Sequence, residues 1–564
     1  MTAVGVRRAA EDAPTDALAA ARRWLFGEKW LFAVVVWIPF ILILWRAVKF
    51  SWELPPYPAD SWSYYELSRS FPGDPMHLHV FRAYITAEPY SASFPPLWPL
   101  VIAIVDGLTG AGFRSGQLAG VACYVIAAAF LDQAGRRWFA VRGLGPAILL
   151  VLFIFTPSLQ EMVSSAPIGL TVMLVAALLM LMANPEPLSA RQCSWLGVAG
   201  GLLMLTRFDT AAFVVLLPLV LVLLGCLRRK DLLRVYVTLA LTLSPWIAYS
   251  LLRFRTPFAS DNSRVAMAVP KTFVLDYWPD GVPTLLSDPG GWFNRVFGLT
   301  KQFWQMTLRV LDEAQTPGFL ALITGFVVIV SVGLTKWSPA GRHRNLGPLL
   351  VDQLRTIVRH RGVQILAAVT VLQYLALGTA LSTSGYLQPR YFVVTVLLID
   401  LTLVAIVLAV PHKPPLGATF ACLALLWLGY LRFYSMERTV PFIEGYPFTY
   451  AIGLPFDDVY ALASCVTEED RVLFARDAGE GYMFGAITDG KGAMEPSNWL
   501  RLTDEQRGRF FRDYRITRVF VSPAAIPMTS ERMKVARQLA TSAGIPPENV
   551  KEVCTAGLYT VGPL

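Results

Sequence analysis

Long runs of apolar residues, each about the length needed to cross a lipid bilayer, recur along most of the chain. The first run begins at Trp30 and the last ends near Phe433. Because a helix needs about 20 apolar residues to cross a bilayer, these runs predict membrane-spanning helices. We predict eleven spans, near residues 30–50, 116–134, 144–162, 164–183, 194–207, 209–226, 233–252, 318–335, 363–380, 391–410 and 414–432.

The composition agrees with this pattern. Hydrophobic residues make up 55% of the 564 residues and charged residues only 16%, and the mean hydropathy is +0.49. A soluble core of this size would not use so much apolar surface. The net charge is +9, but the Arg and Lys residues form short clusters between apolar runs. We therefore predict an α-helical multi-pass membrane protein that contacts the lipid bilayer, and we expect no nucleic-acid partner.

The basic clusters predict the orientation of the spans, because short loops rich in Lys and Arg face the cytoplasm. The run from Leu97 to Val105 is too short to cross, so we interpret it as an interfacial or re-entrant helix on the outer side. The clusters then all face the cytoplasm: Arg7, Arg8, Arg22 and Arg23, Arg136-Arg137 with Arg142, Arg228-Arg229-Lys230, Arg342-His343-Arg344 with Arg355, Arg359 and Arg361, and His412-Lys413.

This topology predicts three parts of a protein in the cell (inner) membrane. Residues 1–29 form a cytoplasmic N-terminal segment, and residues 30–435 form the transmembrane domain. The transmembrane domain has two long outer loops, residues 51–115 and 253–317. Residues 436–564 form an extracytoplasmic domain.

Helix and strand patterns alternate in this last domain. We expect helices at 457–464, 502–514 and 530–543 and strands at 471–474 and 518–521, which together predict a small α/β domain. Cys465 and Cys554 both lie in it. An oxidising compartment allows a disulfide between them, and the sequence alone leaves the pairing open.

Short polar motifs at the outer ends of the spans carry the candidate chemistry. In the first outer loop, Asp60 stands four residues before Tyr64, followed by Gly73-Asp74 and Pro95-Pro96-Leu97-Trp98-Pro99. Thr206-Arg207-Phe208-Asp209 interrupts a long apolar stretch, and Arg390-Tyr391 precedes a late span.

In this order the motifs resemble those of the GT-C fold glycosyltransferases, in the branch that contains protein O-mannosyltransferases and lipid A aminoarabinose transferases. The resemblance covers roughly residues 30–432. It implies transfer of a hexose or pentose from a polyprenyl-phosphate donor to a glycan, lipid or protein acceptor at the outer leaflet. The absence of a P-loop or a dinucleotide-binding glycine motif in the sequence agrees with a donor that is not a nucleotide sugar. The chain departs from the family at Phe94, where members often have a basic residue, so the residue that grips the donor phosphate is left open.

Under this interpretation Asp60 is the general base. An acceptor hydroxyl is a poor nucleophile at neutral pH, and a carboxylate that accepts its proton contributes roughly 10²–10⁴-fold to the rate. Arg390, at the outer end of a span, suits the donor phosphate because a guanidinium forks onto phosphate oxygens. The structural alternative for Asp60 is a cap on the helix that contains Trp62 to Phe71.

The other candidate substrate-binding residues also have structural alternatives. The resemblance implies that Tyr64 and Tyr391 bind substrate. Tyr64 also belongs to an aromatic cluster that is typical of a membrane interface. Arg207 and Asp209 contact the donor or form a local ion pair, since unpaired charges are expensive at membrane depth.

Three further acidic or basic residues are weaker candidates. Asp74, between Gly73 and Pro75, fits a turn, and Arg255 fits either a phosphate contact or an exposed loop charge. Glu66 lies about 240° around a helix from Asp60, and we predict that it faces solvent.

No metal ligands are assigned. His77 and His79 flank Leu78, but no third ligand has a telling spacing, so a divalent ion is left open and no cofactor is assigned. Two other functions compete with sugar transfer, namely a transporter or flippase of lipid-linked sugars and a noncatalytic scaffold in cell-envelope assembly. Such transporters usually have inverted repeats, and the sequence shows none.

Overall fold

The computed structural model describes residues 36–45, 48–49, 60–71, 73, 94–410 and 456–561 apart from short gaps. The N-terminal segment 1–29 and the predicted span at 414–432 lie outside the described residues. The gaps within the two longer ranges are residues 156–157, 159–163, 185, 258–260, 271–275, 338–345, 386–387, 476–479, 489–490 and 524–525.

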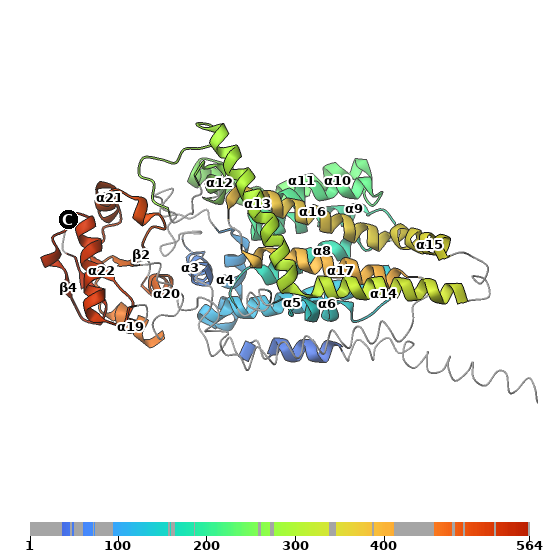
Figure 1. The fold of residues 1–564 in the computed structure, drawn as a ribbon, viewed down its shortest axis with the longest axis horizontal. Helices are drawn as coiled ribbons and strands as arrows, with labels where there is room; N and C mark the ends of the chain where they lie inside the picture. The colour runs from blue at the N-terminus through green and yellow to red at the C-terminus, as the bar shows by residue number, and fades with distance from the viewer. Residues whose placement is uncertain are drawn as a thin grey trace, which may run out of the picture.

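The described chain is mostly helical, with a long helical bundle beside a C-terminal sheet (Figure 1). The helices of the bundle and of its end nearest the sheet are α3 (Asp60–Ser70), α4 (Leu97–Thr109), α5 (Ser115–Phe139), α6 (Leu144–Leu152), α8 (Ile168–Met182), α9 (Ala190–Thr206), α10 (Ala211–Leu223), α11 (Leu232–Phe254), α12 (Asp261–Met267), α13 (Pro289–Ala314), α14 (Thr316–Trp337), α15 (Leu346–Arg359), α16 (Arg361–Ser384) and α17 (Val393–Ala409).

Four described helices are long and apolar enough to cross a membrane: Gly112–Phe139, Arg229–Phe254, Arg361–Ser384 and Pro389–Ala409. They coincide with four of the predicted spans. Shorter apolar helices occur at Val36–Trp45, Leu97–Thr109, Ile168–Met182 and Phe208–Leu223. The chain is therefore a membrane protein by its helices, and the total of eleven spans stays a prediction.

One predicted span has a different form in the structure. Residues 289–314 were expected to belong to an outer loop, but they form α13, which meets α14 at a bend of 70°. Together the two helices are long and apolar enough to be one broken span. Gln315 makes the bend, with a positive φ of 57° between the two helices.

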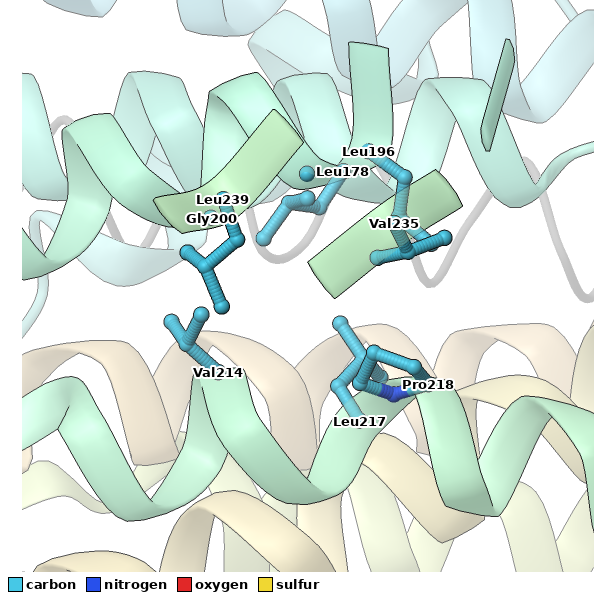
Figure 2. Close-up of a pocket in the computed structure, with 9 residues that line it drawn as sticks. Leu178, Leu196, Gly200, Val214, Leu217, Pro218, Val235 and Leu239 are labelled. Carbon is cyan, nitrogen blue, oxygen red and sulfur yellow. The ribbon is translucent and has the colours of Figure 1, made fainter. Parts of the chain in front are cut away.

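Close helix contacts hold the bundle together. α5 packs along α8, and α9 packs along α11. A Cβ atom on Gly197 would lie 2.4 Å from the carbonyl oxygen of Val235, so only glycine allows α9 to approach α11 this closely. A small crevice nearby is lined by side chains of α8, α9, α10 and α11 (Figure 2). Because its lining is apolar, it offers no side-chain partner for a phosphate or a sugar.

The C-terminal part contains a five-stranded sheet in the order β2-β1-β3-β5-β4. β1 pairs in parallel with β2 and β3, and β5 pairs antiparallel with β3 and β4. The predicted strands and helices of this region are all present, and β2, β4, β5 and α20 were not predicted. The elements are α19 (Phe456–Ser464), β1 (Val472–Phe474), α20 (Glu480–Ile487), β2 (Gly492–Met494), α21 (Asp504–Asp513), β3 (Arg518–Phe520), α22 (Thr529–Ser542), β4 (Lys551–Glu552) and β5 (Leu558–Thr560).

A disulfide joins Cys465 to Cys554 across 89 residues of this part of the chain. It links the end of α19 to the turn between β4 and β5. The pairing that the sequence left open is therefore present.

The C-terminal part docks onto the two segments that were predicted to be outer loops. The side-chain amide of Asn498 forms two hydrogen bonds with the backbone of Tyr277, at 3.0 and 2.9 Å, and the Tyr277 hydroxyl donates to Asp513 at 2.5 Å. α20 packs against α3 (Figure 1). These contacts place residues from all three segments at one end of the bundle.

Candidate active site

Helix α3 presents the predicted base, and it is fixed by contacts on several sides. The backbone N–H of Ser165 donates to the Ser61 hydroxyl at 3.2 Å, and the Trp98 indole donates to the Ser165 carbonyl at 2.6 Å. Trp98 belongs to the Pro-Pro-Leu-Trp motif and is fully buried. Through Trp98 and Ser165, this motif therefore helps to anchor the helix that carries Asp60.

Asp60 forms an ion pair with Arg390, 330 residues later in the chain. The Nη2 atom of Arg390 donates to Oδ2 of Asp60 at 2.8 Å. Arg390 lies in the 3₁₀ turn Pro389–Phe392 that leads into α17, where the proline ring suits the start of a helix. The Arg390 side chain is 22% exposed and the Asp60 side chain 31%, so an incoming ligand can reach this pair.

Arg207 and Asp209 form a second ion pair in the turn between α9 and α10. Nε and Nη2 of Arg207 donate to the two oxygens of Asp209 at 3.0 and 2.7 Å. Arg207 has an extended backbone that ends α9, and the Thr210 hydroxyl donates to its carbonyl at 2.7 Å. The local ion pair that was the structural alternative for these residues is therefore present.

The ring of Tyr391 lies beside the arginines of both ion pairs. The guanidinium carbon of Arg207 lies 4.9 Å from the centre of the Tyr391 ring, and that of Arg390 lies 5.5 Å from it. An aromatic face attracts such cations, so Tyr391 holds two like charges at one site.

Tyr64 lies one helical turn after Asp60 and is buried. Burial raises the pKa of its hydroxyl, and the negative charge of Asp60 raises it further, while Arg207 and Arg390 lower it. The phenol is therefore neutral at physiological pH and available as a hydrogen-bond donor. Its ring packs edge-on against Phe94, with the ring centres 4.8 Å apart. Phe94, where the resemblance led us to expect a basic residue, thus supports Tyr64.

Six of the eight predicted site residues form one cluster, namely Asp60, Tyr64, Arg207, Asp209, Arg390 and Tyr391. They come from three segments that are far apart in the sequence. Arg255 is not among them: it is exposed at the C-terminal end of α11, and within the described residues no hydrogen bond or ion pair joins it to the cluster. Asp74 lies outside the described residues.

The prediction for Glu66 is wrong. Its side chain is buried, with only 6% of its surface exposed, because α3 is covered by other elements on most of its faces. The helical period separates Glu66 from Asp60, but it does not tell which face of a short helix meets solvent. Ser165 was also missed, because no motif marks it.

The described residues contain no group of three His, Cys, Asp or Glu side chains that could hold a metal ion. His77 and His79 lie outside the described residues. The charged groups that the structure brings together are the two carboxylates and two guanidiniums of the cluster, a set suited to a proton transfer beside a bound anion.

No family model and no curated protein matches the chain. Among solved structures, it is similar to ArnT from Cupriavidus metallidurans bound to undecaprenyl phosphate, with 14% identity, coverage of 83% of this chain and 86% of that one, and a TM-score of 0.38. The apo ArnT structure matches with 13% identity, coverage of 91% and 95%, and a TM-score of 0.38.

The archaeal oligosaccharyltransferase AglB from Archaeoglobus fulgidus is also similar, in a complex with an inhibitory peptide and a dolichol-phosphate. Its identity is 13%, the coverage is 90% of this chain and 71% of that one, and the TM-score is 0.48. ArnT and AglB both have the GT-C fold, the fold of the family that the sequence motifs resemble.

Proposed function

We propose that the chain is an integral-membrane glycosyltransferase that transfers a sugar from a polyprenyl-phosphate donor to an extracytoplasmic glycan, lipid or protein. The observation that carries the proposal is the ion pair between Asp60 and Arg390, beside Arg207, Tyr64 and Tyr391. A proton acceptor and two cations at one partly exposed place are the groups that such a reaction needs.

The reaction is a displacement at the anomeric carbon of the sugar. The acceptor oxygen forms a bond to this carbon, and its proton moves to the Asp60 carboxylate. The bond between the anomeric carbon and the phosphate oxygen breaks, and the polyprenyl phosphate leaves with the bonding electrons. Arg390 stabilises the charge of the leaving phosphate, and Arg207 adds a fixed positive charge nearby.

Tyr64 and Asp209 have supporting roles in this scheme. The neutral Tyr64 phenol donates a hydrogen bond to the substrate without adding charge. Asp209 is held by both of its oxygens to Arg207, so it positions this cation and does not act as a second base or as a nucleophile.

We assign the site to the outer face of the membrane. The basic clusters in the sequence support this orientation. The contacts of Tyr277 with Asn498 and of α20 with α3 support a common side for α3, the segment at Tyr277 and residues 456–561. The C-terminal part then covers α3 and faces the acceptor.

Transfer of labelled sugar tests this function directly. The purified full-length chain is incubated with a panel of polyprenyl-phosphate sugars and a membrane extract as acceptor source, and the products are identified by mass spectrometry. We expect release of polyprenyl phosphate together with a glycosylated product, and loss of both with Arg390→Ala, because this change removes a guanidinium from the phosphate.

The same donor panel, tested with the protein reconstituted in vesicles, separates the two rival functions. A transporter or flippase moves the intact donor between leaflets of a vesicle and leaves the sugar–phosphate bond unbroken. A scaffold does neither. Donor movement without cleavage, or no change in any donor of the panel, would reject the glycosyltransferase proposal.

A further inference from the structure

Both cations of the cluster already have anionic partners in the structure. Each of its two arginines is paired with a carboxylate, Arg390 with Asp60 and Arg207 with Asp209. The four side chains carry two positive and two negative charges, so the site is formally neutral. Arg390 gives its Nη2 group to Asp60, so a donor phosphate that binds this group displaces the carboxylate.

The two ion pairs differ in how firmly they are held. Arg207 and Asp209 are two residues apart, share two hydrogen bonds and are 13% and 23% exposed. Arg390 and Asp60 are joined by a single hydrogen bond between distant segments and are more exposed. Two parallel hydrogen bonds give an arginine–carboxylate pair more energy and a more fixed geometry than one. The phosphate therefore meets the weaker pair at Arg390.

The same pair occupies the predicted base. Oδ2 of Asp60 accepts the hydrogen bond from Arg390, so an acceptor hydroxyl competes with Arg390 for this oxygen while the pair lasts. When a phosphate takes Arg390, this oxygen is released beside the donor sugar.

We infer that the donor phosphate exchanges with Asp60 for the Nη2 group of Arg390, so that donor binding releases an oxygen of the base. This inference rests on the proposed function. It gives the two arginines different parts: Arg207 stays fixed by Asp209, and Arg390 moves from one anion to another.

Binding of undecaprenyl phosphate without any acceptor tests the exchange. The purified full-length wild type, Asp60→Asn, Arg390→Gln and the double variant are titrated in detergent, and Kd is measured by native mass spectrometry. If Asp60 competes for Arg390, Asp60→Asn tightens binding roughly three- to tenfold, the scale of a partly exposed ion pair. The gain disappears when Arg390 is already glutamine, because there is then no shared cation.

The remaining outcomes separate the inference from the proposed function. If the wild type binds undecaprenyl phosphate and Asp60→Asn binds it equally or more weakly, the exchange is wrong and the function stands. A gain that persists in the Arg390→Gln background means a general charge effect and also overturns the exchange. If the wild type does not bind the lipid phosphate, the proposed function itself fails. Should Asp60→Asn not fold, Asp60→Ser gives the same comparison.

Discussion

Removing the negative charge of Asp209 should destabilise the protein, because Arg207 is then left mostly buried without its carboxylate. The Arg207 side chain is 13% exposed and the Asp209 side chain 23%. Breaking a fully buried ion pair from one side costs about 3–5 kcal/mol, and an exposed pair contributes about 1 kcal/mol or less. For this mostly buried pair, with two hydrogen bonds, we expect Asp209→Asn to cost about 2 kcal/mol.

The measurement is thermal unfolding of the purified protein in detergent. We expect the apparent Tm of Asp209→Asn to fall by several degrees. The matched control is Glu468→Gln, which breaks the pair with Lys491 at 3.1 Å in the C-terminal part of the chain, where the Glu468 side chain is 95% exposed. Because this pair is solvated, the control should leave the Tm almost unchanged. Equal Tm values for the two variants would show that Arg207 is not held in the way that we describe.

Three further predictions concern the cluster and its side of the membrane. Asp60→Asn should lower turnover by roughly 10²-fold or more if Asp60 is the base. The matched change Asp504→Asn, in the first turn of α21, should leave turnover unchanged. Near-normal transfer by Asp60→Asn would leave Asp60 only a structural role, worth about 1 kcal/mol or less of stability. Tyr391→Phe should keep donor affinity within about twofold because the ring that faces both arginines remains, and Tyr391→Leu should weaken it about fivefold or more; equal affinities for the two variants contradict the ring's part in holding the cations. Single cysteines at Ser93 and Thr503 should react with a membrane-impermeant reagent from the same side, and labelling from opposite sides refutes the topology.

The apolar pattern predicted the long helices well, because a span of about 20 apolar residues has few other structures in a membrane. α5, α11, α16 and α17 lie where the pattern predicts spans. α13 was assigned to a loop because charged and polar residues such as Lys301 and Arg309 interrupt its apolar face. The strands β2, β4 and β5 were missed because each has only two or three residues, too few to show an alternating pattern.

The candidate site was predictable as a set of residues but not as a set of contacts. Asp60, Arg207 and Arg390 could be selected because charged residues at the ends of apolar runs are rarely incidental. Which carboxylate meets which arginine depends on the packing of α3 against the turns before α10 and α17. The ion pair between Arg207 and Asp209 could be expected because the two residues are two positions apart. No sequence feature indicates that Asp60 pairs with Arg390, which lies 330 residues later.

The 330 residues between Asp60 and Arg390 set the order in which the protein is built. Ribosomes add about 5–20 residues per second, so Asp60 emerges tens of seconds before its arginine exists. α20, which packs against α3, is synthesised later still, because it begins at Glu480. A chain that stalls between the last predicted span and this helix has all its predicted spans but lacks the helix that packs on α3, so the surroundings of Asp60 are complete only when the ribosome has nearly finished.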